Sequence, residues 1–560
     1  MEFVKIYLFC LLTSLSIYSY GYTLNRILLK FDIKNSFELI FIGIIFLSFL
    51  ALFLNFFTEL NVYLNTFIFL LSFFLLYIYK DTIDITEIIK KIAIVSIIGF
   101  ITFILDHSNR PDAGLYHLPF VSMINEEKII LGSVNLHYRF GHISSLQYLY
   151  SIFNNLILGE NGILIPLTII FSSVLLYFYE ELKLQKENIL KLFSIFSLIY
   201  ILTSMNRYSG FGNDDPAHMF YLLCIYNILK FFVFKKDSQL IFNKITLFGV
   251  NTFLIKQFYA LVLIFPLFIF FFNFRKISLF NKTNIFAIFI ISFWLIKNVL
   301  ISSCLLYPVN FSCFNSLEWS PIDTRWEAKK ASEESEAWAK AWPDRADKSK
   351  NFEKYLSNYE WINDWMNNHI KTVIKKLAPI SILSILLIIY CLYIFKLKKN
   401  IKKNNFLLFL FLVNLSFSVV WFFKFPMYRY GAAYLGSSII LFNIILLHNL
   451  KLKENLKKIF NVILIFICFF VCFKNFNRIF ENLDKKYVDY PWPKKNSFTN
   501  NNVKNYNEPI IYENQIIYYV SSPYPLCMYS KAPCTTFRNL NLKRKIYPGN
   551  YKVLMFNRSN

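Results

Sequence analysis

The sequence lacks three features, and each absence excludes or weakens one interpretation. No small-residue cleavage site follows the first apolar run, residues 6–20, so we interpret this run as a retained membrane span and not as a signal peptide. No internal repeat is visible, whereas paired halves are typical of secondary transporters. No spacing of histidine, cysteine and acidic residues matches a known metal-binding signature, so we expect that no cofactor is required.

Acidic residues are scarce as well. The chain has 35 of them against 59 lysines and arginines, which gives a net charge of +24. The basic residues cluster in short loops beside apolar runs, for example at residues 274–282, 396–403 and 451–458. This is the positive-inside pattern of membrane proteins, which membrane insertion and anionic lipids produce. The charge therefore indicates a lipid bilayer as partner, and we expect no nucleic acid.

Apolar residues make up 56% of the 560 residues, including 64 Phe and 36 Tyr, which excludes an ordinary soluble protein. They occur in runs near the roughly 20 residues that a helix needs to span a bilayer. We therefore predict an all-α polytopic membrane protein with about 14 transmembrane helices. The expected spans are residues 6–24, 37–57, 62–79, 90–105, 163–181, 189–205, 218–234, 241–255, 258–273, 284–303, 372–395, 406–424, 432–450 and 459–474.

The basic loops determine the side of the membrane on which each connection lies. With these loops in the cytoplasm, residues 144–158 cannot form a full span, because a crossing there would reverse every later connection. We interpret this segment as an interfacial or re-entrant helix. Both termini then lie outside, on the face that also holds five polar segments, which are residues 106–142, 205–217, 256–257, 304–371 and 425–431.

The expected organisation has five parts. They are N-terminal transmembrane helices (1–89), a transmembrane core (90–303) whose first extracytoplasmic loop covers 106–158, an extracytoplasmic loop (304–371), C-terminal transmembrane helices (372–474) and an extracytoplasmic tail (475–560). The tail is expected to be a small mixed α/β segment with strands at 515–522 and 550–556.

The loop 304–371 holds six of the nine tryptophans, and residues 322–350 are expected to be helical. We favour an amphipathic helix with tryptophans at the level of the lipid headgroups. The alternative is a lid over a substrate groove, with aromatic rings that stack on sugars. Two close cysteine pairs, Cys304/Cys313 and Cys527/Cys534, fall on the outside face, where disulfides persist, so we expect both to be disulfides rather than free thiols.

The segment 106–142 carries four of the seven histidines together with Asp106 and Asp112. Residues 134–141 alternate strictly, so an extended segment would place Asn135, His137 and Arg139 on one face, suited to a polar or anionic ligand. Asp112 could instead cap a short helical turn, and any single histidine could be a satisfied polar residue. For the segment as a whole we favour function, because ionisable groups at membrane depth are costly. His117 is a further ligand-binding candidate.

Two other outside segments carry charge. Asp214 and Asp215 precede a span, where they could cap its helix or take part in catalysis. With the loop histidines they could also hold a divalent metal, which is the weaker alternative. Lys256, and Arg429 with the neighbouring Tyr428, run against the positive-inside bias. They could anchor the chain to lipid phosphate or bind the phosphate of a lipid-linked substrate.

These groups form the minimal set for one reaction. A sugar on a polyprenyl phosphate has a good leaving group, which needs cations but no general acid. The acceptor hydroxyl needs one carboxylate as base. Asp112 with Lys256 and Arg429 would supply both, and Asp106, Asp214 and Asp215 are the other candidates for the base.

The arrangement resembles the GT-C superfamily of membrane glycosyltransferases, which includes protein O-mannosyltransferases and lipid A aminoarabinose transferases. The residues that carry the resemblance are an acid in a large outside loop just after a span, a second outside acidic motif and a polar tail. A closer likeness is to multi-pass proteins of bacterial surface-polysaccharide clusters, through DAGLYHLP, NEEKIILGSVNLHYRFG, the stretch from Cys304 to Ser320 and PMYRYG. Together these motifs extend over residues 90–435.

The resemblance implies inverting transfer from a polyprenyl-phosphate-linked donor to a glycan or lipid acceptor. The base would be Asp112, at the periplasmic face of the bacterial inner membrane. Many GT-C enzymes have this loop directly after their first span. Here three expected spans come before the span that leads into the loop, so the fourth span would correspond to the first span of the GT-C core. The alternatives are an O-antigen polymerase or ligase, and a transporter or flippase of lipid-linked sugars.

Overall fold

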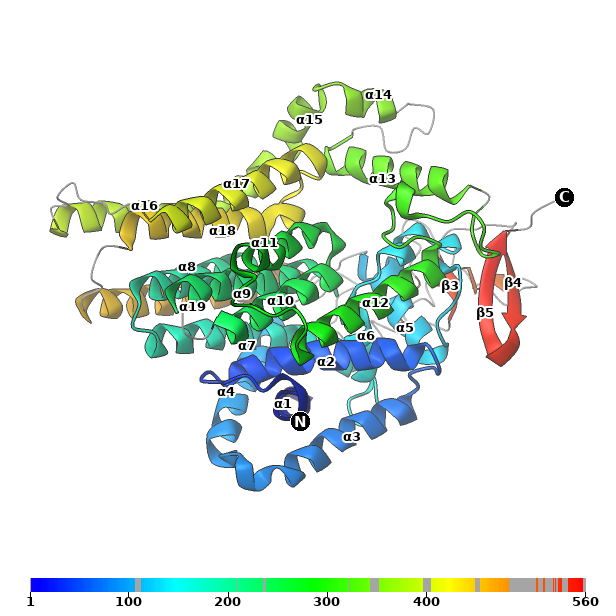
Figure 1. Ribbon diagram of the computed structural model, residues 1–560, viewed down its shortest axis with the longest axis horizontal. Coiled ribbons are helices and arrows are strands. Elements are labelled where there is room, and N and C mark those ends of the chain that lie inside the picture. The colour runs from blue at the N-terminus through cyan, green and yellow to red at the C-terminus, as the bar shows by residue number, and fades with distance from the viewer. Residues whose placement is uncertain are drawn as a thin grey trace.

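Helices form most of the chain in the computed structural model, and the long ones lie side by side in a bundle (Figure 1). The structure describes residues 2–105, 112–208, 210–234, 238–321, 323–342, 352–395, 404–448, 454–482, 510–511, 517–518, 527, 529, 532–535 and 542–556. The expected catalytic candidate Asp106 lies outside these residues.

The long helices follow the apolar runs of the sequence. They are α1 (Glu2–Leu24), α2 (Phe37–Asn55), α3 (Val62–Ile78), α4 (Ile85–Leu105), α7 (Ile165–Leu184), α8 (Asn188–Ser204), α9 (Asp214–Val233), α10 (Ser238–Ile255), α11 (Ile264–Asn273), α12 (Lys282–Ser302), α16 (Ile370–Phe395), α17 (Asn405–Lys424), α18 (Tyr428–Leu447) and α19 (Glu454–Asn482). Each expected span coincides with one of them, and a 3₁₀ turn, η7 (Gln257–Leu263), precedes α11.

Nine of the described helical segments are long and apolar enough to cross a membrane. They are Phe3–Leu29, Phe37–Asn55, Ile85–Leu105, Gly159–Leu184, Asp214–Val233, Lys282–Ser302, Asn405–Lys424, Tyr428–Leu447 and Phe460–Arg478. Val62–Ile78, Asn188–Ser204 and Gln257–Asn273 are shorter apolar helices. A helical, polytopic membrane chain is therefore confirmed, whereas the number of about 14 spans stays a prediction.

Two glycines allow the first two helices to approach closely. A Cβ atom on Gly21 would lie 1.8 Å from the carbonyl oxygen of Leu39, and one on Gly43 would lie 1.9 Å from that of Ile17. Small residues at such crossings allow helix backbones to come together where the surrounding lipid provides no hydrophobic driving force. The crossing of α1 and α2 thus depends on both glycines.

The segment 144–158 does not span, as predicted. Its helix α6 (Ser145–Ile152) has 8 residues, a length of about 12 Å against the roughly 30 Å of a bilayer core. A capping box starts it: the Ser144 hydroxyl accepts a hydrogen bond from the Leu146 N–H, and the Gln147 side chain accepts one from the Ser144 N–H. Its residues are buried, so α6 belongs to the packed interior beside α5 (Leu118–Glu126).

The described part of the tail docks on the first of the loops that were expected outside. The antiparallel hairpin of β4 (Leu542–Tyr547) and β5 (Tyr551–Phe556) reaches it through Leu131, whose N–H donates to the Lys552 carbonyl and whose carbonyl accepts from the Leu554 N–H. A second small sheet has the strand order β1 (Ile510–Ile511), β2 (Ile517–Tyr518), β3 (Cys534–Thr535). Both strands predicted in the tail are therefore present in part, as β2 and β5.

Both expected disulfides, Cys304–Cys313 and Cys527–Cys534, are present. The loop 304–371 contains α13 (Thr324–Ala339), α14 (Phe352–Ser357) and α15 (Trp361–Asn368). Trp361 and Trp365 share one face of α15, but they are buried against Phe422 of α17. The rings of this pair therefore attach the loop to the bundle, and the expected headgroup-level position of the loop helix stays a prediction.

A buried ion pair joins the C-terminal parts of α7 and α9. Glu181 of α7 is 1% exposed and pairs with Lys230, near the C-terminus of α9, at 2.9 Å. Its carboxylate also accepts hydrogen bonds from the side chains of Tyr226, Asn35 and Gln185. Both oxygen atoms of the carboxylate thus have hydrogen-bonding partners, which is the condition under which a buried charge is tolerated.

We expect Lys230→Met to destabilise the protein by about 3 kcal/mol, because it leaves the Glu181 carboxylate buried without its cation. The double variant Glu181→Gln/Lys230→Met should recover most of this loss. Thermal unfolding in detergent measures both, with the exposed Lys183→Met as the control. Equal melting temperatures of the Lys230→Met and control proteins would show that the pair contributes nothing.

Candidate functional site

A cavity of about 1370 Å³ lies where the polar segments meet. All five segments expected on the outside face contribute to its lining: the first loop, the loop before α9, the turn at Lys256, the long loop with α13, and the turn between α17 and α18. These segments are far apart in the sequence. The shared location follows from helices that begin or end at the same end of the bundle.

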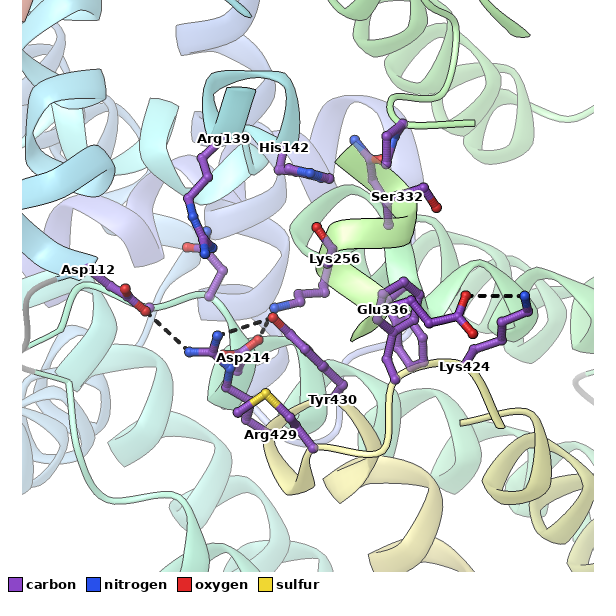
Figure 2. Close-up of a pocket in the computed structure, with 18 of the residues that line it drawn as sticks. Asp112, Arg139, His142, Asp214, Lys256, Ser332, Glu336, Lys424, Arg429 and Tyr430 are labelled. Carbon is purple, nitrogen blue, oxygen red and sulfur yellow. Dashed lines mark hydrogen bonds and ion pairs between the residues drawn. The ribbon is translucent and has the colours of Figure 1, made fainter. Parts of the chain in front are cut away.

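The two central ion pairs of the cavity join different segments (Figure 2). Asp112 lies at the start of a π-helical turn, η3 (Ala113–His117), and its Oδ2 accepts from Nη1 of Arg429 at 3.2 Å. It makes no capping hydrogen bond to this turn, so its position serves the cavity and not the helix end. Burial alone would raise the pKa of Asp112, but Arg429 and Arg139 lower it below its usual value.

The turn that carries Arg429 is fixed through its backbone. Five of its carbonyl oxygens, which lie between Pro426 and Ala432, accept hydrogen bonds from buried side chains. The donors are Trp365, Trp421, His218, Tyr259 and Tyr200. A Cβ atom on Gly431 would lie 2.4 Å from the Trp421 ring, so only glycine fits there. The guanidinium therefore projects from a rigid turn, and its Nη2 donates to the Tyr430 hydroxyl at 3.1 Å.

Asp214 and Lys256 form the second pair. Asp214 opens α9, Lys256 lies between α10 and η7, and the ammonium contacts Oδ1 of the carboxylate. The same ammonium lies 4.4 Å from the centre of the Tyr430 ring, over which Arg429 also lies at 5.0 Å. Tyr430 therefore lies between the two cations and holds them on one side of the cavity.

Arg139 is a third cation of the lining. Its guanidinium lies over the rings of Tyr116 and Tyr138, at 5.1 and 5.3 Å from their centres. No ion pair between Arg139 and a carboxylate occurs within the described residues. Because aromatic rings support the cation without neutralising it, Arg139 is available to an anionic ligand.

His117 and His142 also line the cavity as neutral side chains. Burial lowers the pKa of each imidazole to about 3, and Arg139 and Lys256 add to this effect. Nδ1 of His117 lies 3.0 Å from Nε2 of Gln147. Both rings therefore act as hydrogen-bonding groups and not as charges near neutral pH.

The predicted extended segment at residues 134–141 is wrong. The backbone forms two 3₁₀ turns, η4 (Ser133–Asn135) and η5 (Tyr138–His142), so alternate residues do not share a face. Asn135 donates to the carbonyls of Trp319 and Leu554, and the His137 Nδ1 accepts from the Arg139 N–H. Neither residue lines the cavity, so the structure does not bring them together with the other candidates.

The remaining candidates lie at the cavity. Asp215 lines it beside His218, at 3.7 Å from Nδ1 of that ring. The Tyr428 hydroxyl lies 2.9 Å from that of Tyr200, at the base of the α17–α18 turn. In the described part of the chain, no group of three or more histidine, cysteine or acidic residues is placed to hold a metal ion.

For residues 322–350 we favoured a headgroup-level helix over a lid at a substrate groove, and α13 lies at the cavity, as the second alternative expects. This helix places Lys329, Glu333 and Glu336 on the cavity wall, and Trp338 lies 5.0 Å from the Arg429 guanidinium. Glu336 pairs with Lys424 at 3.3 Å, which ties the helix to the end of α17. The dense charge of residues 322–350 was the available signal, because a helix that only lay in a headgroup layer would not need so many acids.

Residues 3–436 match a family described as Domain of unknown function (DUF8201). The match includes every residue of the ion pairs in the cavity and ends within α18. No curated protein and no solved structure matches the sequence. Because the match extends over well more than half of the 560 residues, the chain belongs to this DUF8201 family.

Proposed function

We propose that the protein is a membrane glycosyltransferase of GT-C type. It would transfer a sugar from a polyprenyl-phosphate-linked donor to a glycan or lipid acceptor. The observation that carries the proposal is a single cavity at one end of the bundle that holds the Asp112–Arg429 pair together with Lys256 and Arg139. This is the set that the transfer requires.

In the proposed reaction the acceptor hydroxyl oxygen attacks the anomeric carbon of the donor. Asp112 takes the hydroxyl proton as the new glycosidic bond forms, and the bond from the anomeric carbon to the phosphate oxygen breaks. The leaving polyprenyl phosphate carries the electron pair away. One carboxylate and attack on the face opposite the phosphate give inversion at the anomeric carbon.

The cations would act on the phosphate. Arg429 keeps Asp112 ionised before substrate binds, and its guanidinium, next to Arg139 and Lys256, favours a bound phosphate. Charge on the phosphate grows as its bond to the sugar breaks, so preorganised cations stabilise the transition state more than the bound donor. Asp214 reduces the net positive charge of the site through its pairing with Lys256.

The size of the cavity supports two substrates. Sites for one small ligand usually have a volume of about 300–1,000 Å³, and this cavity has about 1370 Å³. A sugar phosphate and part of an acceptor glycan would both fit. The long wall formed by α13 and by the disulfide-closed loop around η8 (Asn310–Ser312) extends the cavity away from Asp112.

The cavity end is proposed to face the periplasm of a bacterial inner membrane. Two observations support this orientation. The disulfide Cys304–Cys313 belongs to the same face, and disulfides persist in oxidising compartments. The opposite connections carry the excess of basic residues that marks the cytoplasmic side.

Asp112→Asn should reduce transfer by about 100-fold or more, because the amide cannot take the acceptor proton. The measurement is sugar transfer from a polyprenyl-phosphate-linked donor by purified protein in nanodiscs, or surface glycan in cells with normal expression. Glu318→Gln, an exposed acid outside the cavity, is the control. Wild-type activity in Asp112→Asn would remove Asp112 as the base and make Asp214 or Asp215 the next candidates.

Arg429→Ala and Lys256→Ala should each weaken the binding of polyprenyl phosphate by about tenfold, because each removes one charged contact to the phosphate. Arg429→Ala should also move the acid limb of the pH–rate profile to higher pH, since the guanidinium lowers the pKa of Asp112. Lys545→Ala, which removes an exposed cation of β4, is the matched control. Unchanged phosphate affinity in both cavity variants would argue against the phosphate-binding role.

A membrane-impermeant maleimide should label Ser316→Cys in intact cells but label Lys186→Cys only after permeabilisation. Ser316 is exposed at the cavity end, and Lys186 is exposed in the connection between α7 and α8. Labelling of the unsubstituted protein corrects for its own cysteines. The reverse pattern would place the cavity in the cytoplasm and overturn the proposed orientation.

A further inference from the structure

Gln147 has only one possible amide orientation. Its Oε1 lies 2.9 Å from the backbone nitrogen of Ser144, and that N–H can only donate. A flipped amide would place two donors against each other. The capping box of α6 therefore fixes the Nε2 group of Gln147, which donates its hydrogen to Nδ1 of His117 at 3.0 Å.

The orientation of Gln147 determines the tautomer of His117. A ring nitrogen that accepts a hydrogen bond carries no proton, so the neutral imidazole has its hydrogen on Nε2. Within the described residues Nε2 has no hydrogen-bond partner, and His117 is a lining residue of the cavity. Gln147 and His117 are 3% and 8% exposed, so water does not compete for the bond between them.

We propose that His117 is a neutral hydrogen-bond donor to an oxygen atom of the bound sugar donor, and that Gln147 is the positioning residue that keeps it in the Nε2–H form. For its ligand the proposal rests on the proposed function. An N–H at this position suits an oxygen with lone pairs, either of the sugar or of the phosphate. It complements Asp112, which in the same cavity accepts a hydrogen.

The charged groups around His117 do not favour its protonation. Asp112 precedes the same turn, Asp214 faces it from α9, Lys256 from the α10–η7 connection and Arg139 from η5. The two acids raise the pKa of His117, whereas the two cations and, most strongly, burial lower it, to about 3. The donor is therefore present without a charge near neutral pH, where Asp112 is ionised.

Gln147→Glu tests the assignment because glutamate keeps the capping box but reverses the partner of the imidazole. A carboxylate accepts from Nδ1–H, so the neutral ring presents a lone pair at Nε2 and loses its donor. The carboxylate also raises the pKa of His117, and protonation restores the Nε2–H. The measured quantity is the ratio of the transfer rate of this variant to that of the wild type. This ratio should be about 0.1 or less at high pH, and it should rise as the pH falls through the raised pKa of His117.

Gln147→Met is the matched control, because it removes the amide without adding a charge. It leaves the tautomer of His117 unfixed but not reversed, so it should lower transfer less than Gln147→Glu does at high pH, by a factor that does not change with pH. A pH-independent ratio for Gln147→Glu as well would mean that residue 147 has only a structural role, and it would overturn the proposal. Melting temperature and gel filtration establish that each variant is folded.

The ¹⁵N resonances of histidine-labelled full-length protein in lipid report the tautomer without any assay of activity. The His117 signals, identified from their loss in His117→Asn, should show a protonated Nε2 and an unprotonated Nδ1 in the wild type, and the reverse in Gln147→Glu at high pH. A protonated Nδ1 in the wild type would overturn the tautomer even if the protein transfers sugars. If the spectra are as expected but Asp112→Asn does not reduce transfer, the tautomer of His117 is correct and the proposed function is wrong.

Added polyprenyl phosphate and polyprenyl-phosphate-linked sugar distinguish the two kinds of oxygen. A shift of the Nε2 signal with both ligands indicates contact with the phosphate, and a shift with the sugar-linked form alone indicates contact with the sugar. If both ligands bind and neither shifts this signal, His117 does not touch the donor and the proposal is wrong.

Discussion

Charge pairing at the end of an apolar helix bundle is the constraint on which the site depends. Asp112 and Arg429 are 317 residues apart and meet across the cavity, and Asp214 meets Lys256 beside them. Ionised groups near a membrane are costly unless they are paired or solvated. Each pair therefore forces two distant segments together. Arg139, which also lines the cavity, lies over the Tyr116 ring and forms no ion pair with a carboxylate of the described residues.

A frame of buried aromatic side chains holds these charges in place. Tyrosine and tryptophan combine a large apolar surface with one polar atom, and in the α17–α18 turn that atom donates a hydrogen bond to a backbone carbonyl. The same residues thus supply packing and orientation. The helix α13 closes the frame from the outer side, where Trp338 covers Arg429 and Glu336 is paired to Lys424. This packing positions the Arg429 guanidinium in the absence of a ligand, which is what the proposed chemistry requires.

The sequence was sufficient for the helices but not for every side chain. Apolar runs and basic loops predicted where each long helix lies and which polar segments share an end of the bundle, because hydrophobic length and insertion charge act locally along the chain. Alternation at residues 134–141 predicted a strand and failed. Those residues pack between the tail hairpin and the Cys304–Cys313 loop. Asn135 donates hydrogen bonds to Trp319 and Leu554 there, and such tertiary contacts determine the backbone conformation more strongly than the alternating pattern does.

The sequence by itself determined that the chain is a polytopic helical membrane protein and that Asp112, Lys256 and Arg429 belong to a few polar segments at one end of the helices. The tertiary structure alone decided the partners: Arg429 with Asp112, Lys256 with Asp214, Gln147 with His117, and α13 as a wall of the cavity. The physical reason is that span length and charge bias are properties of short segments. Ion pairs, tautomers and cavity walls depend instead on distances between segments that only the packed bundle fixes.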